Sequence, residues 1–154
     1  MDFTIEVASE KYLDGIMAVL QTANMHHIPS KEMPELDLSK CFIAKSGGKV
    51  VGVSGYKMLP DGRGKTTLLA VLPEFQCHGI GYALHVRRIE AMESLGAERI
   101  LTNADREESI EWYKRHFGYV VIGSLRKLHD FGAPAGHWTT LEMSISKWRE
   151  KNGT

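Results

Sequence analysis

The sequence predicts a single domain of the α/β class, spanning residues 1–154, with a mixed sheet of about six or seven strands and helices on both faces. Three observations support this fold class. Strand-length and helix-length apolar patterns alternate along the chain, and a paired-glycine signal joins two early strands as a hairpin. A third strand leads through a glycine turn into a helix and then another strand, which should lie parallel to it.

The first elements are a strand and a helix. Residues 3–7 alternate apolar and polar side chains, as a half-buried strand does. Ser9 is placed to cap a helix from about Glu10 to Thr22, which carries its apolar residues inward. From residue 24 to residue 40 the pattern breaks up, because two prolines rule out one continuous helix.

The middle of the chain predicts an antiparallel meander. Strands at Cys41–Lys45 and Val50–Leu59 flank Ser46-Gly47-Gly48-Lys49, whose glycines suit a tight hairpin turn. Gly52 and Gly55 weaken the second strand, so we expect a bulge or a close backbone approach there. A turn over residues 60–64 then returns the chain into a central strand at Lys65–Leu72.

The central strand ends in the most informative stretch of the sequence. Pro73 stops the apolar run, and Gly79 and Gly81 follow in a tight turn. The pattern then becomes helical, with an expected inward face of Ile80, Leu84, Ala91 and Leu95, bordered by Ala83 and Met92. A strand, a glycine turn and a helix together point free backbone N–H groups and a positive dipole end at an anion. This stretch therefore predicts a phosphate-bearing ligand.

The C-terminal part predicts three further strands and one helix. Gly96 ends the preceding helix, and residues 99–103 form the next strand. Asp105 is placed to cap a helix whose apolar stripe is Ile110, Tyr113 and Phe117 and which ends at Gly118. Strands follow at residues 119–125 and 138–145, separated by a glycine- and proline-rich loop. No role is predicted for the tail from residue 147 to residue 154.

Three families of phosphate loop compete for the glycine turn. The Rossmann fingerprint needs a small residue where Leu84 stands, and a Walker loop ending at Gly64-Lys65-Thr66 needs a glycine where Leu59 stands. The string Gln76-Cys77-His78-Gly79-Ile80-Gly81 instead resembles the pyrophosphate loop of the GCN5-related N-acetyltransferase (GNAT) superfamily, Gln/Arg-x-x-Gly-x-Gly/Ala. Residues 69–75 resemble that family's strand and entry turn. The alternative is a generic strand-to-helix turn, but strand, proline, glutamine and helix in register favour the family.

A second stretch resembles the same family. In residues 109–119 a tyrosine-bearing helix precedes a glycine–aromatic pair, as in the family's second signature. The sequence departs from that signature in two respects. One extra residue separates Tyr113 from Gly118, and Arg106 stands where the family often has an asparagine.

The resemblance implies the GNAT fold, in which two central parallel strands splay apart and acetyl-coenzyme A binds in the gap. The backbone of Leu69, Ala70 and Val71 would then bind the pantetheine arm, with Arg106 close to it. The pyrophosphate would be bound by the loop and first helical turn: Gln76, Cys77, His78, Gly79, Ile80, Gly81, Tyr82 and Ala83. The Val71 amide would bind the oxyanion, and Tyr113 would give a proton to the departing thiolate.

The implied activity is direct transfer of an acetyl group from acetyl-coenzyme A, or of a longer acyl group, to a primary amine, without an acyl-Cys77 intermediate. Asp105 is the candidate general base, but it also has the expected capping role. The resemblance implies that two loops border the acceptor. Their polar and aromatic residues are candidates for contacting it, and equally could be ordinary loop and strand-start residues: His26, His27, Glu32, Glu35, His129, Asp130, His137 and Trp138. Two other interpretations stay open, a non-catalytic module that senses acyl-coenzyme A and a scaffold subunit with a degenerate acetyltransferase fold.

Composition is ordinary for a soluble globular protein and decides nothing by itself about function. Nineteen basic and nineteen acidic residues argue against a dedicated nucleic-acid surface. The two cysteines are far apart, and they form neither a disulfide framework nor a metal-binding pair, so no metal is predicted. No signal peptide or long apolar span is present, which predicts a cytoplasmic protein without a membrane partner. A homodimer is left open.

Overall fold

The computed structural model describes residues 2–23, 36–127 and 135–152. The strands are β1 (Thr4–Val7), β2 (Cys41–Ser46), β3 (Lys49–Met58), β4 (Gly64–Val71), β5 (Arg99–Ala104), β6 (Val120–Arg126) and β7 (His137–Ser144). The α-helices are α1 (Leu13–Thr22), α2 (Ile80–Ser94), α3 (Glu107–Phe117) and α4 (Ile145–Lys151). Short 3₁₀ turns lie at η1 (Glu10–Tyr12), η2 (Leu38–Lys40) and η3 (Pro73–Phe75).

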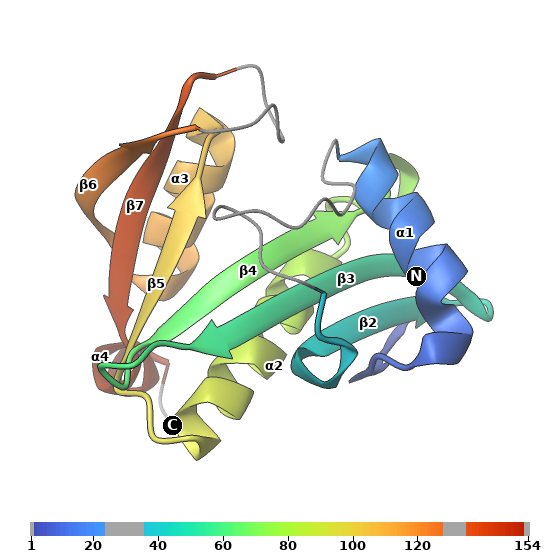
Figure 1. The fold of residues 1–154 in the computed structure, drawn as a ribbon, viewed down its shortest axis with the longest axis horizontal. Coiled ribbons are helices and arrows are strands. Elements are labelled where there is room, and N and C mark those ends of the chain that lie inside the picture. Colours follow the sequence, from blue (N-terminus) through green and yellow to red (C-terminus); the bar gives the residue numbers. More distant parts are fainter. Residues whose placement is uncertain (1, 24–35, 128–134, 153–154) are drawn as a thin grey trace.

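The strands form one mixed sheet in the order β1-β2-β3-β4-β5-β7-β6. Every neighbouring pair is antiparallel except β4 and β5, which are parallel. These two strands pair only where Gly64 lies opposite Ile100 and Lys65 opposite Leu101. Beyond that point they diverge, so the sheet opens as a V whose closed end is near α4 (Figure 1). The predicted fold class is confirmed, including the splayed central pair.

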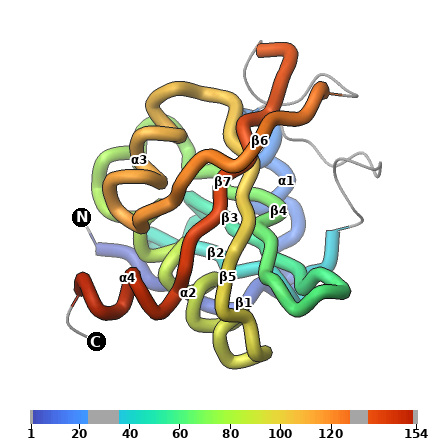
Figure 2. The backbone as a smooth tube through the Cα atoms, turned by 90° about the vertical axis from the view of Figure 1, so that its left-hand side faces the viewer, coloured from blue at the N-terminus to red at the C-terminus, as the bar shows by residue number. Residues whose placement is uncertain are grey.

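The helices cover both faces of the sheet. Seen edge-on, α1 lies on one side and α2, α3 and α4 on the other (Figure 2). Gly15 lets α1 approach the sheet, because a Cβ at that position would lie 3.0 Å from Val50. Gly64 does the same for α2, since a Cβ there would clash with Met92. At these two positions the missing Cβ lets α1 and α2 pack closely against the sheet.

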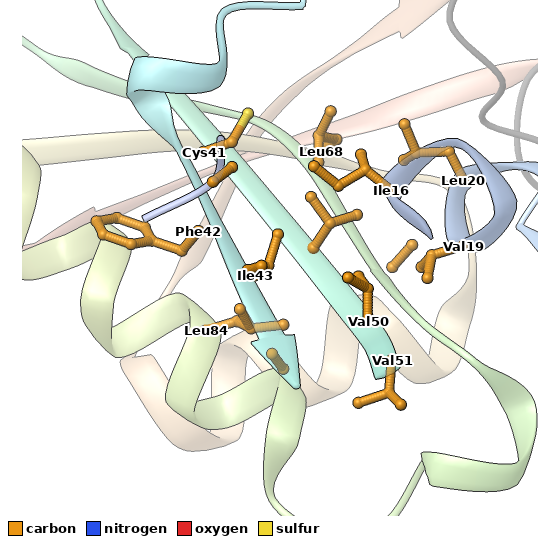
Figure 3. Packing of buried hydrophobic residues seen from close by; sticks show 14 of the residues in the cluster. Ile16, Val19, Leu20, Cys41, Phe42, Ile43, Val50, Val51, Leu68 and Leu84 are labelled. Carbon is orange, nitrogen blue, oxygen red and sulfur yellow. The ribbon is translucent and has the colours of Figure 1, made fainter. Parts of the chain in front are cut away.

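Each arm of the V has its own hydrophobic core. On the β1–β4 side, α1 and α2 pack against β2 and β3, with Ile16, Leu20, Ile43 and Leu84 fully buried (Figure 3). On the β5–β7 side, the core is formed by α2, α3, α4 and the strands and includes Phe117. Both cores therefore include side chains of α2, which spans the two arms.

Two local expectations were wrong, and one helix was not predicted. The Ser9 side chain makes no capping hydrogen bond, and α1 begins only after the 3₁₀ turn η1. The N-cap of α3 is Arg106 rather than Asp105. The tail is helical: Ser144 caps α4 by accepting a hydrogen bond from the Lys147 amide, and Trp148 packs into the core.

The buried face of α2 also differs from the expected one. Leu95 is 56% exposed, whereas two polar residues, His85 and Arg88, are completely buried. The face consists of Ile80, Leu84, His85, Arg88, Ile89 and Met92. The expected face was wrong because histidine and arginine were taken to face solvent. Both can be buried here because hydrogen bonds inside the protein offset the cost of burying them.

Candidate active site

A cavity of about 1050 Å³ lies in the gap between β4 and β5. Most residues that the sequence analysis assigned to a ligand site line it: Leu69, Ala70, Val71, Gln76, Cys77, Gly79, Gly81, Tyr82, Asp105, Arg106 and Tyr113. His78, Ile80 and Ala83 are not among the lining residues, and the Ile80 side chain is buried in the core instead. The fold therefore brings the two sequence signatures to opposite walls of one cavity.

The glycine turn presents a row of free amides at the wide end of the cavity. Gly79 is the N-cap of α2 with φ +84°, and Cys77 adopts φ +65° although it is not glycine. In the described chain, the N–H groups of residues 77–82 donate no backbone hydrogen bond, whereas the Ala83 N–H bonds to the Gly79 carbonyl at 3.0 Å. Left-handed residues next to a helix N-terminus form a concave anion site. The Gln76 side chain supports the turn by donating to the Val71 carbonyl at 3.1 Å.

The free edge of β4 continues the site from the turn. The Leu72 N–H donates to the Val51 carbonyl on β3 at 2.8 Å. Because successive N–H groups of a strand point in opposite directions, the amides of Val71 and Leu69 point into the gap. The β5 pairing stops at Lys65, so this stretch of β4 faces the cavity rather than another strand.

Arg88 is the site residue that sequence analysis missed. It is fully buried on α2, and its Nη1 donates to the carbonyls of Gly55 (3.2 Å) and Leu68 (2.7 Å). Gly55 and Leu68 are paired across β3 and β4, beside the β-bulge that follows Gly55. Its Nη2 donates to the Tyr113 hydroxyl oxygen at 3.3 Å. One signal was present, because Arg88 continues the four-residue spacing of Ile80 and Leu84 and so had to be buried.

The contacts of Arg88 also fix the proton of a buried histidine. Arg88 Nε lies 3.2 Å from His85 Nδ1, and an arginine can only donate, so this nitrogen accepts. The ring proton is therefore on Nε2, which donates to the Tyr119 hydroxyl at 3.0 Å. Burial, together with the Arg88 charge, lowers the pKa of His85 well below its usual value, so the ring is neutral. Burial raises the pKa of Tyr119 well above its usual value.

This network orients Tyr113 toward the cavity. The ring is 94% buried, between His85 and Tyr119, with centroid separations of 5.4 and 5.1 Å. Its oxygen accepts a hydrogen bond from Arg88, so the hydroxyl proton points elsewhere and can be donated to a group in the cavity. A tyrosine held in this way has the geometry of a proton donor.

Asp105 closes the site at the end of β5. Its carboxylate Oδ2 lies 2.8 Å from Lys127 Nζ, and both side chains are nearly buried. The same ammonium lies 4.5 Å from the Trp138 ring centroid. His137 is exposed at the start of β7. The remaining candidates for acceptor contacts, His26, His27, Glu32, Glu35, His129 and Asp130, lie outside the described residues.

Two lysines lie near the narrow end of the cavity. Lys57 of β3 and Lys65 of β4 both line it. Burial, together with the nearby charges of Lys57 and Arg88, lowers the pKa of Lys65 from 10.5 to about 8. Neither side chain was predicted to have a role, because the register that brings them together cannot be read from a sequence pattern.

None of the helices in residues 2–23, 36–127 and 135–152 has the length and apolar composition that crossing a membrane requires. Over the same ranges, no three His, Cys, Asp or Glu side chains gather as metal ligands would.

The comparisons with known proteins agree with the fold. Several solved structures share it: Ard1 from Thermoplasma volcanium has a TM-score of 0.77 at 19% identity, covering 94% of this chain and 99% of that one. The ribosomal-protein-S18-alanine N-acetyltransferase from Escherichia coli has a TM-score of 0.71 at 19% identity, covering 94% of both chains. N-acetylglutamate synthase from Neisseria gonorrhoeae, complexed with coenzyme A and N-acetyl-glutamate, has a TM-score of 0.74 at 17% identity.

That last match covers 94% of this chain but only 35% of the synthase, so this chain spans about a third of its length. A comparison with curated protein sequences found no match to this chain. The model of the acetyltransferase (GNAT) family matches residues 13–119, which contain α1, the V-shaped gap, the glycine turn and Tyr113. The chain belongs to the acetyltransferase (GNAT) family.

Proposed function

We propose that this protein transfers an acetyl group from acetyl-coenzyme A directly to a primary amine. The observation that carries the proposal is the continuity of one cavity. It runs from the free amides of the glycine turn, along the unpaired edge of β4, to the oriented hydroxyl of Tyr113. An anion site, a strand edge and a proton donor in that order suit the pyrophosphate, the pantetheine amides and the thioester sulfur.

The binding part of the site uses backbone groups. The amides of residues 77–82 suit the pyrophosphate, because Gly79 and Gly81 keep side chains away from it. The edge of β4 at Leu69 and Val71 suits the amides of the pantetheine arm as an added strand would. Arg106, which lines the cavity at the N-terminus of α3, is placed to contact the same arm.

The reaction forms one C–N bond and breaks one C–S bond. The neutral amine attacks the thioester carbon, and the Val71 N–H stabilises the oxyanion that develops. As the intermediate collapses, the C–S bond breaks and the coenzyme A sulfur takes a proton from the Tyr113 hydroxyl. The attacking nitrogen loses its extra proton to Asp105 or to water. No acyl-enzyme is required, so Cys77 acts only through its backbone.

Two measurements test this function. Coenzyme A should raise the melting temperature. At a hundredfold excess over its Kd it should add about 2.7 kcal/mol to the free energy of unfolding. Acetyl-coenzyme A should then release thiol when amines are supplied, and mass spectrometry should find the acetylated amine. No shift with coenzyme A would overturn the proposal in favour of a scaffold. A shift without acetylated product across a broad amine panel would instead favour a non-catalytic sensor.

A further inference from the structure

Lys57 and Lys65 form a pair of like charges across two neighbouring strands. They lie directly opposite each other in the β3–β4 register. Residues in such positions have Cβ atoms about 5 Å apart on the same face of the sheet. Gly64 faces Met92 of α2. Because successive side chains of a strand point to opposite faces of the sheet, Lys65 points to the other face, away from α2. The two ammonium groups therefore share one small region of the cavity.

Nothing in the described part of the chain neutralises this pair. No ion pair there includes Lys57, Lys65 or the neighbouring Arg88. Lys65 Nζ donates a hydrogen bond to the Thr66 carbonyl at 3.3 Å. The other charged groups lining the cavity are Arg106, Arg126, Asp105 and Glu108, and Asp105 is already paired with Lys127. Like charges placed opposite each other on a sheet destabilise the fold, so an anionic partner would relieve this repulsion.

The position of the pair excludes the coenzyme A phosphates as that partner. Lys65 is six residues from Val71, about 20 Å along an extended strand, at the opposite end of β4 from the glycine turn. Tyr113 instead lies near the middle of β4, because Arg88 joins its hydroxyl to the Leu68 carbonyl. Leu68 is three residues, about 10 Å, from Lys65. The lysines thus lie beyond the reacting thioester, on the acceptor side.

We infer that Lys57 and Lys65 bind a carboxylate of the acceptor, so that the substrates are small amines carrying a carboxylate, such as amino acids. This inference rests on the proposed function. A carboxylate can accept from two ammonium groups at once and remove their mutual repulsion. It would also anchor the substrate with its amine toward the thioester. The pair then determines which amines are acetylated rather than how fast the acyl group moves.

The test compares acceptors that differ only in charge. Each amino acid is offered as the free carboxylate, as its primary amide and as the matching aminoalkyl phosphonate. Hydrogen bonds to charged groups contribute about 1.5–3 kcal/mol, so kcat/KM for carboxylates should exceed that for amides by about 10–100-fold. Lys57→Met and Lys65→Met should each remove most of this preference through KM. Lys65→Arg should retain it, and Lys49→Met, exposed at the β2–β3 hairpin, should change nothing.

A binding experiment gives a second readout without turnover. N-acetyl amino acids and their amides are titrated into the protein with coenzyme A bound. The carboxylate form should bind at least tenfold more tightly, and its affinity should fall above pH 8 as Lys65 loses its proton. The N-acetyl group does not titrate, so the lysines and their neighbours alone set this pH dependence.

Several results would overturn the inference. Equal kcat/KM for carboxylates and amides, or a preference for the phosphonates, would do so. The inference would also be overturned if neither the N-acetyl amino acids nor their amides bound to the protein. An equal loss of kcat for both acceptors in Lys65→Met would assign that lysine to proton transfer instead. In each case, a melting-temperature shift with coenzyme A, together with thiol release from acetyl-coenzyme A when neutral amines are supplied, would leave the proposed function standing. Loss of the shift would remove both.

Discussion

Replacing Lys65 with methionine should stabilise the protein at neutral pH. The pKa of Lys65 is lowered from 10.5 to about 8, and each pKa unit corresponds to 1.36 kcal/mol. The folded state therefore disfavours the charged lysine by about 3 kcal/mol at most. Methionine keeps the aliphatic stem and removes the charge, so we expect a gain of about 2 kcal/mol. For a domain of this size the melting temperature should rise by about 4–8 °C.

The pH dependence separates this electrostatic gain from better packing. Below pH 8 the lysine is charged in both folded and unfolded states, and the full penalty is present. Between pH 8 and 10.5 the folded state releases its proton first, so the unfolded state binds more protons and stability of the parent rises with pH. Above pH 10.5 the lysine is neutral in both states and the penalty is gone. The advantage of Lys65→Met should therefore shrink across this window.

Chemical denaturation at pH 7, 9 and 10.5 measures this difference directly. Lys49→Met is the matched control, because Lys49 is exposed and its replacement should change stability by less than about 0.5 kcal/mol. A Lys65→Met variant that is less stable than the parent at pH 7 would refute the reasoning. A gain that stays constant to pH 10.5 would refute it as well, because packing does not titrate.

Other predictions concern the ligand site. Gly81→Val should lower coenzyme A affinity at least tenfold in a titration while the fold persists, since a Cβ there would meet only Trp112 at 3.9 Å; unchanged affinity would contradict the phosphate loop. Gly79→Ala should lower affinity and stability, whereas Gly62→Ala, with a similar φ of +89°, should lower stability alone. Cys77→Ala should keep turnover within a few-fold, and an acetylated Cys77 found by mass spectrometry would count against direct transfer. Tyr113→Phe should lower kcat by about 10²–10⁴-fold and lower the melting temperature, because Arg88 loses a partner. Full kcat with the parental melting temperature would remove Tyr113 from the site.

The sequence predicted those parts of the fold that depend on local signals. The hairpin at Gly47 and Gly48 forms as expected, with positive φ at both residues. The strand, glycine turn and helix around Gly79 also follow from neighbouring residues, and so does the parallel β4–β5 pair. Helix α4 was missed because its seven residues carry too little periodicity to be distinguished from a tail.

The contacts inside the site could not be predicted in the same way. Arg88 is buried only because Gly55 and Leu68, some 20 to 33 residues away, supply carbonyls for it. The pairing of Lys57 with Lys65 depends on the register of two strands and on the bulge that follows Gly55. A one-residue change of register would send one lysine to the other face. The four-residue spacing from Ile80 and Leu84 places Arg88 on the buried face of its helix, but neither spacing nor composition shows which groups a long-range contact joins.

The hydrogen bonds of Arg88 explain how a splayed sheet can hold the candidate active site in a defined geometry. Each arm of the V is stabilised by its own apolar core, and apolar packing is non-directional, so the cores alone do not fix the width of the gap. Arg88 contacts both arms: Gly55 and Leu68 belong to one, and Tyr113 to the other. Hydrogen bonds from one rigid guanidinium set distance and angle together. The arginine is therefore the element that places the Tyr113 hydroxyl opposite the edge of β4, where the thioester must lie for the proposed reaction.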